Sequence, residues 1–210
     1  TQNQAFSALV FLYKRVLERP LENVEAARSR KDPRVPVVLT RAEVKTVLAL
    51  LEGTPALVVK LLYGCGLRIM EAARLRVQDI DYGYKQVTVR NGKGMKDRVT
   101  PFPAKLEPLL RSHLERVKVI HEQDVAKGHG AVYLPYALAR KYPNAEREWH
   151  WQYVFPSRNL SVDPRSGVTR RHHVDPSVIN KAIKGAVNKA EMTKKVSAHT
   201  FRHRFATHLL

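Results

Sequence analysis

The stretch from Gly64 to Asp81 constrains the fold of this chain more than any other. Gly64 and Gly66 predict the end of one helix and a tight backbone turn. Arg68 is predicted in the first turn of the next short helix, with Glu71 on the same face. Backbone N–H groups at the start of that helix favour a phosphate beside Arg68, although this stretch alone favours an ordinary surface Arg–Glu pair. Apolar residues at helical spacing indicate the helix: Leu67, Met70, Ala73 and Leu75.

The charge balance favours a polyanionic partner. Lys and Arg number 37 against 19 Asp and Glu, which gives a formal net charge of +18 over 210 residues. Such a surface predicts binding to DNA or RNA, and more weakly to anionic lipid. The most apolar run, Ala56–Leu67, is interrupted by Lys60 and falls short of the ~18 residues of a membrane helix, so no membrane partner is expected. The single cysteine, Cys65, excludes an internal disulfide and predicts a reducing, cytoplasmic location.

The order of segments predicts a linker between two domains. Residues 1–19 carry an apolar stripe at helical spacing and are predicted to be the last helix of an N-terminal domain. Residues 20–39 combine charges and prolines without periodicity, which predicts a basic linker that either lies against nucleic acid or is solvated without contacts. Thr40 and Glu43 form a capping-box pattern that starts the main domain, residues 40–210.

The main domain is predicted to be α+β and mostly helical. Alternating β-branched residues bounded by glycines over 78–102 predict a small antiparallel sheet. The tip of its hairpin carries Lys93 and Lys96, beside glycines that let the backbone approach a ligand, although this segment alone favours a solvated loop. Helices are expected at 41–51, 56–63 after a turn at 53–55, 103–127 with Leu109 inward, 177–190 with Val178 inward, and from Ser197 onward.

A segment at about 131–175, between the helices expected at 103–127 and 177–190, is rich in aromatic and basic residues. Both tryptophans of the chain lie in it, close to the basic run Arg170, Arg171, His172 and His173. Aromatic rings beside cations are what stacking of unpaired bases on a phosphate-binding surface requires. The alternative, which composition alone favours, is a satellite core under a long loop.

Four side chains form a constellation suited to phosphodiester chemistry: Arg68, Lys93, His199 and Arg202. Two guanidiniums hold the non-bridging oxygens of a phosphate and stabilise the charge that grows in a pentavalent transition state. A lysine protonates a leaving oxygen, and a histidine bonds the phosphate or moves a proton. The sequence contains no phosphate-cradling P-loop and no nucleophile elbow, and basic neighbours disfavour a metal at the His199 and His203 pair, so no metal or cofactor is expected.

Three boxes of the sequence resemble those of tyrosine recombinases of the phage integrase type. They are G-C-G-L-R-I-M-E-A-A-R-L, G-K-G-M-K-D-R and S-A-H-T-F-R-H-R-F-A-T-H-L-L, in that order. The resemblance implies site-specific DNA recombination by strand cleavage and rejoining through a 3′-phosphotyrosine. It makes Arg68, Lys93, His199 and Arg202 catalytic, with Lys96 the less favoured hairpin lysine and Glu71 a structural support. The implied fold is the recombinase catalytic domain, preceded by the last helix of a core-binding domain.

The segment at about 131–175 resembles the insert of integron integrases. The runs that carry this likeness are Y-L-P-Y-A-L-A-R-K-Y-P-N-A, W-Q-Y-V-F-P-S and D-P-R-S-G-V-T-R-R-H-H. The resemblance implies that Trp151, His172 and His173 stack on bases flipped out of a folded single-stranded site, in a segment that Pro164 helps to shape. Together with Arg170, Arg171 and Lys96, they form the predicted DNA-binding set.

The sequence departs from the family pattern at its C-terminal side. The nucleophilic tyrosine and the second His or Trp box of the family follow the H-x-x-R helix, whereas none of the tyrosines here follows His199. We therefore expect this stretch to bind a phosphodiester without forming the phosphotyrosyl link, and to be inactive and monomeric alone. The complete enzyme is expected to act as a homotetramer on DNA. The alternative function is a non-catalytic DNA- or RNA-binding module that kept the recombinase fold.

Overall fold

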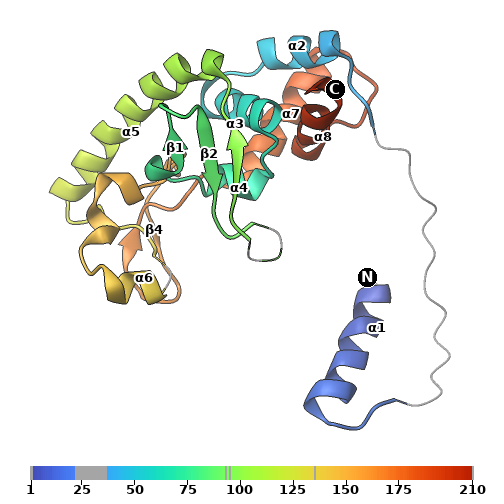
Figure 1. The fold of residues 1–210 in the computed structure, drawn as a ribbon, viewed down its shortest axis with the longest axis vertical. Coiled ribbons are helices and arrows are strands. Elements are labelled where there is room, and N and C mark those ends of the chain that lie inside the picture. Colours follow the sequence, from blue (N-terminus) through green and yellow to red (C-terminus); the bar gives the residue numbers. More distant parts are fainter. Residues whose placement is uncertain (1, 22–36, 93, 95, 135, 210) are drawn as a thin grey trace. The chain divides into compact units, whose positions relative to one another are not determined.

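The computed structural model describes residues 2–21, 37–92, 94, 96–134 and 136–209, with side chains omitted at 136 and 206–209 (Figure 1). The chain divides into two compact units, Thr1–Pro36 and Val37–Leu210. Most of the predicted linker at 20–39 lies outside the described residues. In the first unit, α1 (Gln2–Phe11) continues as a π-helical turn over Leu12–Val16.

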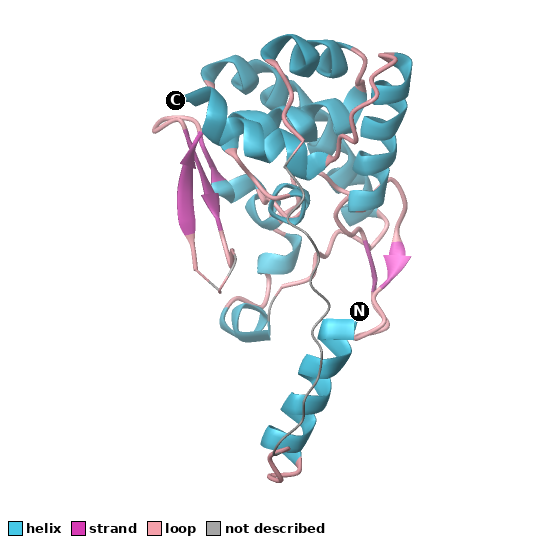
Figure 2. Cartoon of the chain, turned by 90° about the vertical axis from the view of Figure 1, so that its right-hand side faces the viewer, coloured by secondary structure: helices cyan, strands magenta, loops and turns pink. Residues whose placement is uncertain are grey.

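The second unit is mostly helical with two small sheets, so the predicted α+β class is confirmed. Figure 2 shows the strands at the margins of a helical body. The helices are α2 (Arg41–Ala49), α3 (Gly53–Cys65), α4 (Ile69–Ala73), α5 (Glu107–Ala126), α6 (Tyr136–Lys141), α7 (Pro176–Lys189) and α8 (Ala198–Leu209), with 3-10 turns at Val77–Asp79, Ala104–Leu106, Ala145–Arg147 and Trp149–Trp151. None of the described helices is long and apolar enough to cross a membrane.

The predicted capping box at the start of α2 is confirmed. The amide of Glu43 donates to Thr40 Oγ1 at 3.1 Å, and the amide of Thr40 donates to Glu43 Oε2 at 2.7 Å. These two bonds satisfy N–H groups that the helix itself leaves without partners. Lys194, which precedes α8, also pairs with the Glu43 carboxylate at 2.7 Å, so the cap ties two distant segments together.

The predicted antiparallel sheet is also confirmed. Its strands are β1 (Ile80–Asp81), β2 (Gln86–Val89) and β3 (Arg98–Pro101), in the order β1-β2-β3. Val89 pairs with Arg98, so β3 begins opposite the end of β2 and directly after the hairpin tip. A second, two-stranded sheet pairs β4 (Ser161–Val162) with β5 (Thr169–Arg170).

The break predicted at two glycines occurs at only one of them. Helix α3 runs through Gly64 to Cys65 and ends at Gly66, whose φ of +63° suits a residue without Cβ. Helix α3 also starts earlier than expected, at Gly53, because Pro55 fits the first turn, where backbone N–H groups have no helical partner. Arg68 is the residue before α4 rather than part of its first turn.

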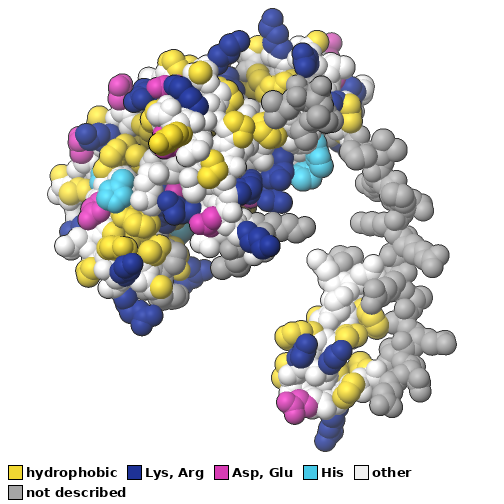
Figure 3. Space-filling model, in the orientation of Figure 1, with side chains coloured by type: hydrophobic (Ala, Val, Ile, Leu, Met, Phe, Trp, Pro, Cys, Tyr) yellow, Lys and Arg dark blue, Asp and Glu magenta, His cyan; other side chains and the backbone are white. Residues whose placement is uncertain are grey.

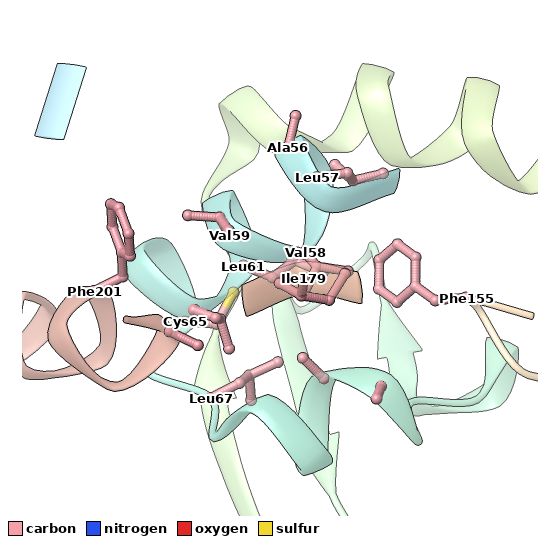
Figure 4. Packing of buried hydrophobic residues seen from close by; sticks show 14 of the residues in the cluster. Ala56, Leu57, Val58, Val59, Leu61, Cys65, Leu67, Phe155, Ile179 and Phe201 are labelled. Carbon is pink, nitrogen blue, oxygen red and sulfur yellow. The ribbon is translucent and has the colours of Figure 1, made fainter. Parts of the chain in front are cut away.

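Helix α3 is the centre of the hydrophobic core. Figure 4 shows Phe201 of α8 and Phe155 on either side of the α3 side chains. Burial raises the pKa of the Cys65 thiol to about 12, which fits a packing role. Two residues that were predicted to point into the core do not, since Leu109 is 46% exposed and Val178 is 49% exposed.

Candidate active site

The carboxylate of Glu71 is the centre of the site. Its side chain is only 8% exposed, at the third position of the short helix α4. Oε2 accepts the backbone N–H of Arg68 at 2.7 Å, and Oε1 accepts Arg68 Nη1 at 2.8 Å. The carboxylate of Glu71 thus holds both the backbone and the guanidinium of Arg68, which is how it can support Arg68 structurally.

Arg98 binds the same carboxylate and was missed in the sequence. Its Nη1 donates to Glu71 Oε1 at 2.8 Å and its Nη2 donates to Oε2 at 2.6 Å, a bidentate pair. Burial raises the pKa of Glu71, but the hydrogen bonds from Arg98 and Arg68 outweigh burial and bring it down to about 2. A carboxylate with this pKa is ionised throughout the physiological pH range.

Arg202 reaches the same place from α8. Its Nη1 lies 3.6 Å from Glu71 Oε2, which is an ion pair beyond hydrogen-bond distance. This buried nitrogen makes no hydrogen bond to any described residue. Burial and the neighbouring Arg68 lower the pKa of Arg202, as expected where cations are brought together. Three guanidiniums thus face one carboxylate, so positive charge is in excess and the site is suited to an anion.

His199 lies one helical turn from Arg202 on the exposed side of α8. Its Nε2 lies 2.8 Å from His203 Nε2, so the N–H of one imidazole donates a hydrogen bond to the unprotonated nitrogen of the other. Burial, His203, Arg202 and Arg68 all lower the pKa of His199. Its imidazole is therefore neutral at neutral pH and able to accept or donate one proton beside the arginines. Figure 3 shows Lys and Arg side chains grouped beside a histidine on the visible face of this unit.

The structure describes only one of the two hairpin lysines. Lys93 lies outside the described residues, and Lys96 is exposed. The base of the hairpin is fixed by two bonds, from Asn91 N to Asp97 Oδ1 at 2.8 Å and from Gly92 N to Lys96 O at 3.0 Å. A Cβ on Gly92 would lie 2.9 Å from Lys96 O and 3.1 Å from Arg98 Nη1, so a larger residue here would shift the hairpin backbone beside the Arg98 guanidinium.

The insert at about 131–175 is joined to the arginine-bearing part through Arg76. The guanidinium of Arg76 donates to the carbonyls of Trp151 and Tyr133, the latter at 2.7 Å, and stacks over the ring of Tyr153 at 4.7 Å. Val77 N also donates to Gln152 O at 3.0 Å. Arg76 was not predicted, because nothing in its local sequence indicates partners more than fifty residues away.

The predicted stacking residues gather around one tyrosine. His172 lies nearly parallel to the buried ring of Tyr153, at 6.3 Å between centroids, and His173 packs edge-on against it at 5.4 Å. Trp151 is partly buried against a small core of its own: Val132, Leu134, Ala145 and Tyr153. The satellite core posed above as one alternative is therefore present, with Trp151, His172 and His173 half-buried at its edge. Stacking of bases on these rings stays a prediction.

Arg170 and Arg171 are occupied within the protein. Arg171 holds the buried Asp124 with Nε at 2.5 Å and Nη2 at 2.9 Å, and its Nη1 donates to the carbonyls of Ser157 and Arg158. Arg170 is 13% exposed and donates to Val132 O at 3.2 Å. Binding of DNA by either guanidinium competes with these bonds.

The model of the phage integrase family matches residues 37–210, which is the whole second unit. The chain belongs to the phage integrase family. The match covers the parts that carry Glu71, Arg98 and Arg202 as well as the insert.

Relatives and solved structures agree with the family. The chain is 46% identical over 211 residues to proteins named integrase/recombinase from Escherichia coli and Pseudomonas aeruginosa, covering 100% of this chain and 63% of each relative. It is 30% identical to tyrosine recombinase XerA of Thermococcus onnurineus, over 90% of this chain and 54% of the relative. The chain thus spans less than two thirds of the length of these relatives.

The fold is that of recombinases of known structure. The crystal structure of XerA recombinase matches with a TM-score of 0.54 at 24% identity, over 98% of this chain and 60% of that chain. XerH site-specific recombinase bound to its difH substrate in a pre-cleavage complex matches with a TM-score of 0.57 at 19% identity, over 97% and 52% respectively.

Proposed function

We propose that this chain is the phosphate-binding part of a site-specific DNA recombinase that breaks and rejoins strands through a tyrosine. The observation that carries the proposal is the convergence of Arg68 and Arg202 beside one buried carboxylate, with Arg202 Nη1 still 3.6 Å from that carboxylate. Two guanidiniums so placed neutralise the non-bridging oxygens of a scissile phosphate. Membership of the phage integrase family supports this reading.

The remaining roles follow from the chemistry of the step. His199, neutral beside two arginines, bonds the phosphate and moves a proton. Lys93 protonates the leaving oxygen, with Lys96 as the alternative donor on the same hairpin. No tyrosine of this chain is assigned as the nucleophile, since none follows His199, where the family pattern places it. No metal or cofactor is assigned, since the arginines supply the positive charge.

The partner is DNA, and the complete enzyme acts as a homotetramer in the cytoplasm. The XerH structure that this chain matches is bound to its difH substrate, which supports DNA as the ligand here. Residues 1–19 belong to an N-terminal DNA-clamping domain, and residues 20–39 are the basic linker to the catalytic unit.

The insert is proposed to recognise unpaired bases, as in integron integrases. Its support is the cluster in which His172 and His173 pack on Tyr153, with Trp151 partly exposed beside it. Flat rings of this kind accept a base by stacking. The test compares a DNA hairpin carrying extrahelical bases with a perfect duplex. Trp151→Ala is expected to weaken binding to the hairpin alone, whereas equal loss on both DNAs would make the insert purely structural.

The central proposal is tested on the protein expressed from its complete gene. Duplexes selected from a randomised pool are incubated with it, and covalent protein–DNA adducts are counted on denaturing gels. We expect adducts that Arg202→Gln lowers by 10²-fold or more, while Lys184→Gln on the exposed face of α7 leaves them unchanged. Retained DNA binding with no adduct at any selected site would instead support the non-catalytic binding module.

A further inference from the structure

Arg68 and Arg98 together supply four hydrogen bonds to the Glu71 carboxylate, without Arg202. Oε1 accepts Arg68 Nη1 and Arg98 Nη1, both at 2.8 Å. Oε2 accepts Arg68 N at 2.7 Å and Arg98 Nη2 at 2.6 Å. A carboxylate offers about four lone-pair directions, and four donors already occupy them. Arg202 Nη1 stays 3.6 Å from Oε2, although it is buried and makes no hydrogen bond to a described residue.

From this geometry we propose that Arg98 is a positioning residue, which saturates Glu71 and so keeps Arg202 available to a phosphate. The inference rests on the proposed function of the same site. Its physical basis is competition for one carboxylate. If Arg98 were absent, two acceptor positions on Glu71 would open towards Arg202 Nη1, and the charge-assisted bond between them would hold the Arg202 guanidinium away from an incoming anion.

The place of Arg98 in the fold suits this role. It is the first residue of β3, fixed by pairing with Val89 of β2. Thr100 on the same strand donates from Oγ1 to Cys65 O at 2.6 Å, which ties β3 to the end of α3 just before Arg68. The Arg98 guanidinium is therefore placed by the sheet, independently of α8, which carries Arg202.

The test measures binding of inorganic phosphate to the 210-residue chain. Binding is monitored through the Nε resonances of Arg68 and Arg202 in NMR spectra. Arg98→Met is expected to weaken the phosphate response at Arg202 about tenfold, the loss typical of one charge-assisted hydrogen bond. The matched control is Arg90→Met, which removes the same charge from the residue directly after β2, where it forms an ion pair with Asp79 at 2.7 Å. It is expected to change the affinity less than twofold.

A second variant separates positioning from a general structural role. In Arg98→Met/Glu71→Gln the carboxylate that would capture Arg202 is gone, so phosphate affinity at Arg202 is expected to rise above that of Arg98→Met alone. The control for net charge is Arg90→Met/Asp79→Asn, which makes the same charge changes elsewhere. The inference would be overturned if Arg98→Met/Glu71→Gln bound phosphate as weakly as Arg98→Met. It would also be overturned if Arg90→Met/Asp79→Asn gained as much phosphate affinity over Arg90→Met.

The outcomes also separate this inference from the proposed function. If the unmodified chain shows no phosphate response at Arg68 or Arg202, both fail. If it responds and Arg98→Met responds equally, only the role of Arg98 fails. Should Arg98→Met not fold, Arg98→Lys replaces it, because a single ammonium cannot fill both carboxylate oxygens, and an intermediate loss at Arg202 is then expected.

Discussion

Gly66 lies directly against the ring of Phe205. A Cβ on Gly66 would come within 2.5 Å of Phe205 Cδ1, which is closer than two carbon atoms approach without displacement. Gly66 ends α3 two residues before Arg68, and Phe205 lies on α8 one turn after Arg202. This contact therefore sets the distance between the two segments that carry the arginines.

Gly66→Ala is expected to destabilise the protein by about 2 kcal/mol or more, because it adds left-handed backbone strain to an overpacked contact. The measurement is the midpoint of urea unfolding. Gly185→Ala in α7 is the control: no atom lies within 4 Å of the added Cβ, so the substitution is expected to stabilise by roughly 0.5–1 kcal/mol. A loss no larger than about 0.5 kcal/mol for Gly66→Ala would show that α8 adjusts freely.

Stability is expected to fall with acid through Glu71. Its folded pKa of about 2 lies below the ordinary value of 4.5, so the unfolded chain binds the proton more tightly between these values. The contribution is fully present above pH 4.5 and is lost as the pH falls towards 2, and the shift corresponds to about 3 kcal/mol. Urea unfolding of the unmodified chain and of Glu71→Gln should therefore differ at pH 6 and converge near pH 2.5.

The control for this comparison is Glu107→Gln. Its carboxylate pairs with Lys85 and Arg111, whose side chains are about half exposed. Exposed pairs contribute little to stability, so a smaller change at pH 6 is expected. A difference between Glu71→Gln and the unmodified chain that stays constant from pH 6 to pH 2.5 would contradict the assignment of this acid sensitivity to Glu71.

Arg171 is expected to stabilise the insert. Its side chain is 17% exposed and that of Asp124 is 7% exposed, so Arg171→Met leaves a buried carboxylate unpaired at a cost of about 3 kcal/mol. Arg171→Met/Asp124→Leu should recover most of that loss, because both charges are removed together. Arg165→Met, on an exposed turn of the same segment, provides the control. Stability of Arg171→Met equal to this control, with weaker DNA binding, would instead favour a direct phosphate contact.

The pKa of His199 is expected to rise when Arg202 is neutralised. Arg202, Arg68 and His203 each disfavour the charged imidazole, and removing one cation relieves part of that effect. An NMR titration of the histidine Cε1 protons in Arg202→Gln tests this. Arg111→Gln, on α5, is expected to leave the His199 titration unchanged, and an equal rise in both variants would attribute the effect to net charge alone.

Local patterns predicted the parts of the fold that local forces determine. The capping box at Thr40 and the alternating strands depend on neighbours within a few residues. The end of α3 was predicted less well, because the helix passes through Gly64 and ends only at Gly66. The side of each helix that faces the core was predicted less well. Leu109 on α5 and Val178 on α7 are exposed, although both follow the helical spacing of apolar residues. Periodicity shows that a helix has an apolar side, whereas the packing of other elements decides how far that side extends.

Arg68, Glu71 and Arg202 of the arginine site were predicted from the sequence, and Arg98 was not. Arg68 and Glu71 are three residues apart, and a local reading brings them together. Arg98 is separated from Glu71 by 27 residues and has the appearance of an ordinary strand residue. Arg171 has the appearance of part of a basic run because its partner, Asp124, lies 47 residues away. Long-range ion pairs of this kind have no sequence pattern that identifies them.

The claim that Arg68 and Arg202 together hold a phosphate is tested most directly by anion diffraction. Crystals of the chain soaked in tungstate, a phosphate-like oxyanion, locate the anion by its anomalous scattering. We expect a tungstate within hydrogen-bond distance of both guanidiniums, and its loss in Arg68→Gln/Arg202→Gln while anions elsewhere remain. Tungstate bound only to other basic side chains, with none between Arg68 and Arg202, would contradict the account.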